Sequence, residues 1–128
     1  MTRFTRGGSR INQLSKGLVR ERGKMNKTET KYANWLTAAK LAGEIAEFWF
    51  EPFSLRISAC EAGQPARYTP DFMILMPDGR TFVDDVKTAR GFDDIASLVR
   101  IKVAASEYPL WVFRIVRPAS GGFETQEI

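Results

Sequence analysis

Two aspartates and a lysine are the residues of this 128-residue chain whose types and spacing best suit chemistry. Asp71 begins one apolar segment, and Asp85 and Lys87 lie in the next. Side chains two positions apart on a strand share a face. Asp85 and Lys87 are therefore predicted to point the same way, with Val86 between them pointing to the opposite face.

The two segments are predicted to form a hairpin that brings both acids together. Residues 77–80 (PDGR) have the composition of a turn, with Gly79 where a positive φ is needed. Asp71 and Asp85 are equally far from the centre of this turn, and cross-strand neighbours have Cβ atoms about 4.5–5.5 Å apart. Two carboxylates this close repel each other unless a cation lies between them. We expect Mg²⁺ or Mn²⁺ at this position, with the carbonyl of Val86 as a third oxygen ligand.

Such a cation suits hydrolysis of a phosphodiester. It lowers the pKa of a bound water and stabilises negative charge on a phosphoryl oxygen. Lys87 is expected to stand beside that water and orient it. Each residue also has an ordinary alternative: Asp85 and Lys87 as a surface ion pair worth ~0–1 kcal/mol, and Asp71, after Pro70, as a turn residue.

The composition excludes several other classes of site. The chain has no histidine and a single cysteine, Cys60. These counts exclude histidine-based triads, imidazole metal sites, cysteine-based zinc sites and an internal disulfide. With 44% apolar and 27% charged residues, the chain has the balance of one soluble globular domain. No apolar run approaches the roughly 20 residues of a membrane span, and no secretory signal is evident. We therefore expect a cytoplasmic protein without membrane contact.

Positive charge is concentrated at the N-terminus. Residues 1–27 hold eight Lys or Arg and one acid, whereas the remainder holds eleven basic and fourteen acidic residues, a difference of about −3. A basic arm on an acidic body indicates a polyanionic partner such as a nucleic acid, with a merely solubilising tail as the alternative. The expected phosphate contacts are Arg20, Arg22, Lys24, Arg90, Arg100 and Lys102.

The chain is predicted to comprise a partly disordered basic arm (1–25), one domain (26–118) and a flexible tail (119–128). Within the domain, Asn26 and Glu29 have the capping-box pattern, and Tyr32, Trp35, Leu36 and Ala39 follow at helical spacing, with Gly43 as the stop. The remaining predicted elements are two strand segments within 44–58 broken at Pro52, a loop at 60–66, strands at 67–76 and 81–87, a helix at 93–108 and a last strand at 110–117. This order predicts an α/β or α+β fold with a mixed sheet flanked by helices.

The second helix is predicted to bury a stripe formed by Ile95, Leu98, Val99 and Lys102, at helical spacing. An ammonium is unexpected on a buried stripe. Lys102 is therefore expected either to reach a phosphate in the active cleft or to extend its stem into solvent.

The pattern "YTPDF…DG…FVDDVK" resembles the PD-(D/E)XK nuclease superfamily. Pro70 and Asp71 match its PD, and Asp85, Val86 and Lys87 match its (D/E)XK. The run from 29 to 116 looks like small phage-encoded nuclease domains of the Holliday-junction-resolvase type. It is also similar to the endonuclease subunit of certain transposition machineries. The resemblance implies a restriction-endonuclease-like core. The chain departs from close relatives in carrying Asp85 where they usually have Glu.

The resemblance also implies a further acid on the helix before the sheet. Glu29 matches that position best and would help hold the metal, with its capping-box role as the alternative. The implied activity is that of a metal-dependent endodeoxyribonuclease that acts on branched DNA as a homodimer. The alternatives are a nuclease subunit of a recombination or transposition complex, a catalytically silent DNA-binding or assembly module, and a nuclease for RNA.

Overall fold

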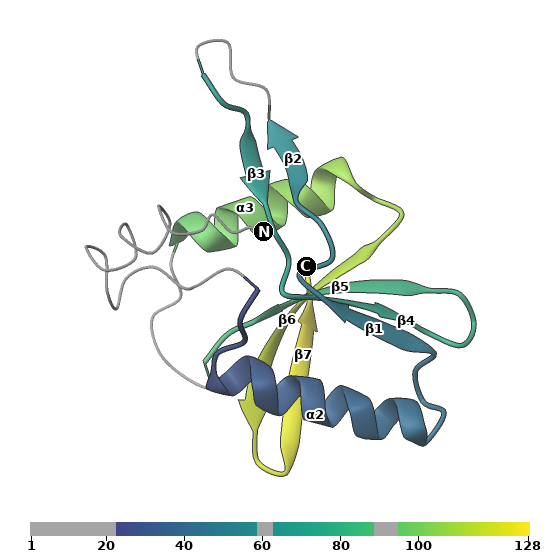
Figure 1. The fold of residues 1–128 in the computed structure, drawn as a ribbon. Helices are drawn as coiled ribbons and strands as arrows, with labels where there is room; N and C mark the ends of the chain where they lie inside the picture. The colour runs from purple at the N-terminus through teal and green to yellow at the C-terminus, as the bar shows by residue number, and fades with distance from the viewer. Residues whose placement is uncertain (1–22, 59–62, 89–94) are drawn as a thin grey trace.

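A computed structural model describes residues 23–58, 63–88 and 95–128 (Figure 1). The elements, in chain order, are α2 (Lys27–Leu41), β1 (Glu47–Phe50), β2 (Leu55–Ser58), β3 (Ala66–Tyr68), β4 (Phe72–Leu75), β5 (Thr81–Val86), α3 (Ile95–Glu107), β6 (Val112–Ala119) and β7 (Gly122–Glu127). Five strands form a mixed sheet in the order β1-β4-β5-β6-β7, in which only β5 and β6 are parallel, and β2 and β3 pair separately. The predicted mixed α+β class is confirmed.

Each face of the five-stranded sheet carries its own apolar cluster. On one face, Tyr32 and Leu36 of α2 pack with Phe72 of β4 and Val116 of β6. On the other face, the β2–β3 hairpin and α3 pack with Val83, Phe113 and Ile115. Figure 1 shows α2 and α3 on opposite sides of the sheet. Successive residues of β5 therefore face different clusters.

Helix α2 begins where the sequence predicts. The Asn26 side chain accepts a hydrogen bond from the Glu29 N–H (2.8 Å), and the Glu29 side chain accepts one from the Asn26 N–H (3.0 Å). This reciprocal pair is the predicted capping box. After the helix, Gly43 adopts a φ of 79°, a conformation that costs glycine little. The cap fixes the residue at which α2 begins. Glu29 and Tyr32 are then on the buried side of the helix.

The prediction of one continuous strand over 67–76 is wrong. β3 ends at Tyr68 and pairs with β2, whereas β4 begins at Phe72 and belongs to the five-stranded sheet. Pro70 lies at the break, where it supplies no N–H to a ladder. The break gives Tyr68 and Asp71 separate strands on which to approach β5.

The predicted inward stripe of the second helix is confirmed only at Leu98, which packs against the apolar cluster on this side of the sheet. Ile95 and Val99 are 76% and 52% exposed, and Lys102 is exposed. The buried positions are Ile101 and Ala104, so the helix packs through a face rotated from the predicted one. The spacing of apolar residues alone does not determine which face of the helix packs inward. Packing against the β2–β3 hairpin determines it.

Residues 119–128 do not form the predicted flexible tail. Gly122–Glu127 form β7, which pairs antiparallel with β6. Phe123 packs edge-to-face against Tyr32, with ring centroids 4.9 Å apart, and against Trp35 at 5.9 Å. The strand therefore extends the sheet beneath α2, and the predicted last strand at 110–117 is followed by another.

Replacing Gly122 by Ala is expected to lower the free energy of unfolding by about 1–3 kcal/mol through overpacking. A Cβ there would lie 2.5 Å from the Trp35 ring, and Gly122 has a φ of 157°. Urea unfolding measures the change. Ser120→Ala in the same turn is the control, with an expected change under about 0.5 kcal/mol because Ser120 is exposed. Equal stability of the two variants would contradict the packing of β7 against α2.

Several predictions fall on segments outside the described residues. These are most of the basic arm with Arg20 and Arg22, residues 60–62 of the loop at 60–66, and Arg90 with the start of the second helix at 93. Within the described ranges, none of the helices has both the length and the apolar character needed to cross a bilayer.

Candidate active site

Asp71 is held against β5 by two hydrogen bonds. Its backbone N–H donates to the Asp84 carbonyl (3.1 Å), and its carboxylate Oδ2 accepts from the Val86 N–H (2.8 Å). The β4–β5 register pairs Phe72 with Asp84, so the next position along puts Asp71 across from Asp85, as predicted. Val86 therefore meets Asp71 through its N–H, whereas the prediction had assigned its carbonyl as a metal ligand.

Asp85 lies on the α3 side of the sheet and is only 6% exposed. Its Oδ1 accepts a hydrogen bond from the Tyr68 hydroxyl (3.0 Å). Its Oδ2 lies 2.8 Å from Lys87 Nζ, an ion-pair contact, yet accepts no hydrogen bond of acceptable geometry among the described residues. One buried carboxylate oxygen is thus held by charge attraction alone.

Tyr68 responds to both carboxylates. Burial raises the pKa of the Tyr68 hydroxyl far above its ordinary value, and the charges of Asp85 and then Asp71 raise it further. The hydroxyl therefore stays protonated and donates its hydrogen bond to Asp85. Both aspartates therefore lie close enough to Tyr68 to raise its pKa. This agrees with the predicted hairpin, which puts the two acids opposite each other. The sequence analysis missed Tyr68, although it lies three residues before Asp71.

Lys87 shares the face of Asp85, as the alternation along the strand predicts. Its ammonium donates a hydrogen bond to Ser97 Oγ of α3 (2.6 Å) in addition to its ion pair with Asp85. The backbone N–H of Lys87 donates to the Val116 carbonyl (2.8 Å), which extends the pairing of β5 with β6. The side chain is 15% exposed, so the ammonium is mostly sheltered and held in one position.

Glu29 is 3% exposed and faces the sheet from the first turn of α2. Its Oε1 closes the capping box, which was the alternative explanation for this residue. The capping role and an inward orientation are therefore both present. One turn later, Tyr32 on the same side of α2 donates a hydrogen bond to Asp84 of β5.

The donor set fits a hard cation in part. Asp85 Oδ2, buried and without a hydrogen bond, is an oxygen that a cation would satisfy. Asp71 Oδ2, by contrast, already accepts the Val86 N–H. Within the part of the chain that the structure describes, no group of three or more Asp, Glu or Cys side chains is arranged to hold a metal ion. The two aspartates are therefore the carboxylate ligands that the site offers.

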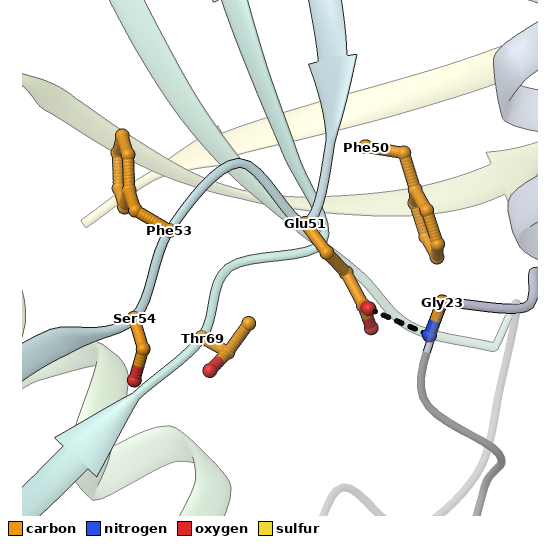
Figure 2. A pocket seen from close by; sticks show the side chains of 6 residues that line it. All are labelled: Gly23, Phe50, Glu51, Phe53, Ser54 and Thr69. Atoms are coloured by element: carbon orange, nitrogen blue, oxygen red, sulfur yellow. Dashed lines mark hydrogen bonds between the residues drawn. The ribbon is translucent and has the colours of Figure 1, made fainter. Parts of the chain in front are cut away.

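Glu51, another acid that the sequence analysis missed, lies beside Asp71. Its N–H donates to the Asp71 carbonyl (2.8 Å), and its φ of 44° is left-handed, which is costly for a residue with a Cβ. Its side chain lines an open pocket of about 420 Å³ and accepts a hydrogen bond from the Gly23 N–H (3.2 Å), as Figure 2 shows. The pocket is also lined by Phe50, Phe53, Ser54 and Thr69. It borders the aspartate pair, and neither aspartate lines it.

Asp84 faces the opposite side of the sheet from Asp85 and is fully buried. It accepts hydrogen bonds from Arg114 Nε and Nη2, both at 2.8 Å, and from the Tyr32 hydroxyl. Burial raises the pKa of Tyr32, and the charge of Asp84 raises it further. Burial alone would lower the pKa of Arg114, but its hydrogen bonds to Asp84 and the charge of Asp84, with smaller contributions from other neighbours, together raise it. Asp84 therefore joins α2, β5 and β6 and has no place in the candidate site.

The predicted phosphate contacts are only partly described. Lys24 is exposed just before α2, and Arg100 and Lys102 are exposed on α3. Arg20, Arg22 and Arg90 lie outside the described residues.

Comparison with protein-family models, with curated proteins and with solved structures finds no match for this chain.

Proposed function

We propose that this protein is a metal-dependent endodeoxyribonuclease. The observation that carries the proposal is the meeting of Asp71 and Asp85 on neighbouring strands, with the Lys87 ammonium 2.8 Å from Asp85 Oδ2. Support also comes from the element order: a helix, three antiparallel strands of one sheet, a helix and a parallel strand, which is the order expected of a restriction-endonuclease-like core. Mg²⁺ or Mn²⁺ is the cofactor in this proposal.

Each residue has a distinct role in the proposal. Asp71 and Asp85 would hold the cation, which would supply Lewis-acid chemistry that activates water and offsets charge on the phosphate. Tyr68 fixes Asp85 by binding Oδ1, so that Oδ2 is the oxygen presented to the site. Lys87, fixed by Ser97, orients the attacking water and stabilises negative charge on the phosphoryl oxygens. The carbonyl of Val86 would add an oxygen, whereas Glu29 closes the capping box of α2 and stands apart from the aspartate pair.

The substrate and assembly follow from the same proposal. Branched DNA is the first substrate to test, and cutting both strands of a junction requires a homodimer. We place the enzyme in the cytoplasm. The basic residues of the arm and of α3 would add sequence-independent affinity for phosphates.

A second function is favoured by one observation. Asp71 and Asp85 are both already held by protein groups, Val86 N–H and Tyr68 hydroxyl, without any ion. This arrangement also suits a catalytically silent DNA-binding or assembly module.

Incubating the protein with four-way-junction, flap and linear duplex DNA separates the two functions. The nuclease is expected to cut at least one substrate with Mg²⁺ or Mn²⁺ and none with EDTA. Matched RNA substrates in the same reactions test the preference for DNA. DNA binding with no cutting under any metal would contradict the nuclease and leave the binding module.

A further inference from the structure

The β2–β3 hairpin presents two arginines side by side. Arg56 of β2 and Arg67 of β3 are directly paired in the antiparallel register, and both are exposed. Directly opposite residues point to the same face, with Cβ atoms about 4.5–5.5 Å apart. The hairpin therefore carries two guanidinium groups on one surface.

Like charges in this arrangement repel each other, and little on the protein offsets the repulsion. Neither arginine forms an ion pair with any residue that the structure describes. By contrast, other basic residues of the body do have acidic partners: Lys40 with Glu47, Arg80 with Asp78, Lys87 with Asp85 and Arg114 with Asp84. A pair of facing arginines without acids fits an external anion, and guanidinium matches phosphate in geometry.

The hairpin is firmly mounted on the body. Leu55, Ile57 and Tyr68 on its inner face are buried in the cluster with α3, and the Tyr108 hydroxyl of α3 donates to the Arg56 carbonyl (2.8 Å). Beyond this base the hairpin projects away from the five-stranded sheet (Figure 1). A hairpin with a packed base and a projecting, positively charged outer face is suited to bind another molecule.

The hairpin is also tied to the candidate active site. Arg67 immediately precedes Tyr68, whose hydroxyl binds Asp85. A polyanion held by Arg67 would thus lie next to the strand that supports the candidate metal ligand. The two-stranded width of the hairpin matches the major groove of B-form DNA, which admits a β-ribbon.

We infer that the β2–β3 hairpin is a DNA-binding ribbon, in which Arg56 and Arg67 bind backbone phosphates of a duplex and hold it against the Asp71–Asp85 site. This inference rests on the proposed function for its choice of DNA. The hairpin would set where the duplex lies, and the aspartates would act on it.

The test measures affinity for a fluorescent DNA duplex in EDTA at several salt concentrations, so that cleavage plays no part. Each lost phosphate contact is expected to reduce the slope of log K against log salt by about 0.9. Arg56→Ala with Arg67→Ala should therefore reduce it by about 1.8 and weaken binding by roughly 60-fold near 0.1 M salt. Arg56→Lys with Arg67→Lys should restore most of the slope.

The matched control removes the same charge elsewhere. Lys40→Ala with Arg80→Ala also subtracts two positive charges, at exposed residues that already have acidic partners, and should change the slope by much less. An equal effect of both double variants would overturn the inference in favour of general attraction by net charge. An equal arginine dependence with an RNA duplex would also overturn it, because the A-form major groove is too narrow for a ribbon. If the hairpin variant lost affinity while the parent protein never cut DNA, only the proposed nuclease activity would fail.

Discussion

Replacing Asp85 by Asn is expected to lower the rate of DNA cleavage by about 10²–10³-fold, the loss typical of removing one group that stabilises transition-state charge. The amide oxygen of Asn can still accept the Tyr68 hydrogen bond, so the side chain keeps its position. The negative charge at Oδ2, which faces Lys87, disappears. Single-turnover cleavage with saturating Mg²⁺ measures the effect on the chemical step.

The same variant should also lose binding of the metal, measured without any reaction. A cation that binds only the folded protein raises its stability, by about 2.7 kcal/mol at a hundred times its dissociation constant. Mn²⁺ is therefore expected to raise the melting temperature of the parent protein and to have little effect on Asp85→Asn. Asp78→Asn, an exposed aspartate in the β4–β5 turn, is the matched control and should behave as the parent. Full activity of Asp85→Asn would remove the basis of the proposal.

The folded structure should tolerate Asp85→Asn better than its burial suggests. The Asn amide NH2 would face the Lys87 ammonium, but Lys87 is partly exposed and keeps a second partner in Ser97, and the repulsion between Asp71 and Asp85 is relieved. The loss in free energy of unfolding should therefore be smaller than for the neighbouring Asp84. A stability loss as large as that of Asp84→Asn, with no change in metal binding, would make Asp85 a structural residue.

The β4–β5 hairpin, which carries the candidate site, could be predicted from the sequence because the residues that define it are close together in the chain. Gly79, with a φ of 92°, fixes the turn, and a period of two then fixes which residues share a face. These two facts put Asp71 across from Asp85 and separate Asp85 from Asp84 without tertiary information. The capping box of α2 is local for the same reason.

The parts that the sequence did not predict depend on contacts between distant segments. Ser97 reaches Lys87 only because α3 packs in a particular phase, which a short apolar spacing leaves open. The left-handed φ of Glu51, which precedes a proline, has no signal in its residue type. β7 is polar along most of its length, and its assignment depends on Phe123 meeting α2. Arg56 and Arg67 become a pair only through the register of the β2–β3 hairpin.

The largest stability effect is expected at Asp84, the residue next to Asp85 in sequence. Asp84→Asn should lower the free energy of unfolding by about 3–5 kcal/mol, because it leaves the mostly buried Arg114 without its counter-charge. In either orientation the Asn amide NH2 also faces an N–H of Arg114, and in one orientation the Tyr32 hydroxyl as well, and all of these groups are donors there. Since a domain is typically stable by only about 5–15 kcal/mol, the variant should unfold at much lower urea.

A double variant that removes both charges distinguishes the cost of an unpaired Arg114 from the cost of losing the other contacts of Asp84. In Asp84→Leu with Arg114→Met, no charge is left buried, and the Met side chain can lie on the Phe82 ring that the guanidinium now covers at 4.0 Å. Replacing a buried pair by apolar residues is often neutral, so this double variant should recover much of the stability lost in Asp84→Asn. Recovery would show that Asp84 serves to neutralise Arg114. A double variant as unstable as Asp84→Asn would instead mean that the stability is lost with the hydrogen bond from Tyr32, which holds α2 against the sheet.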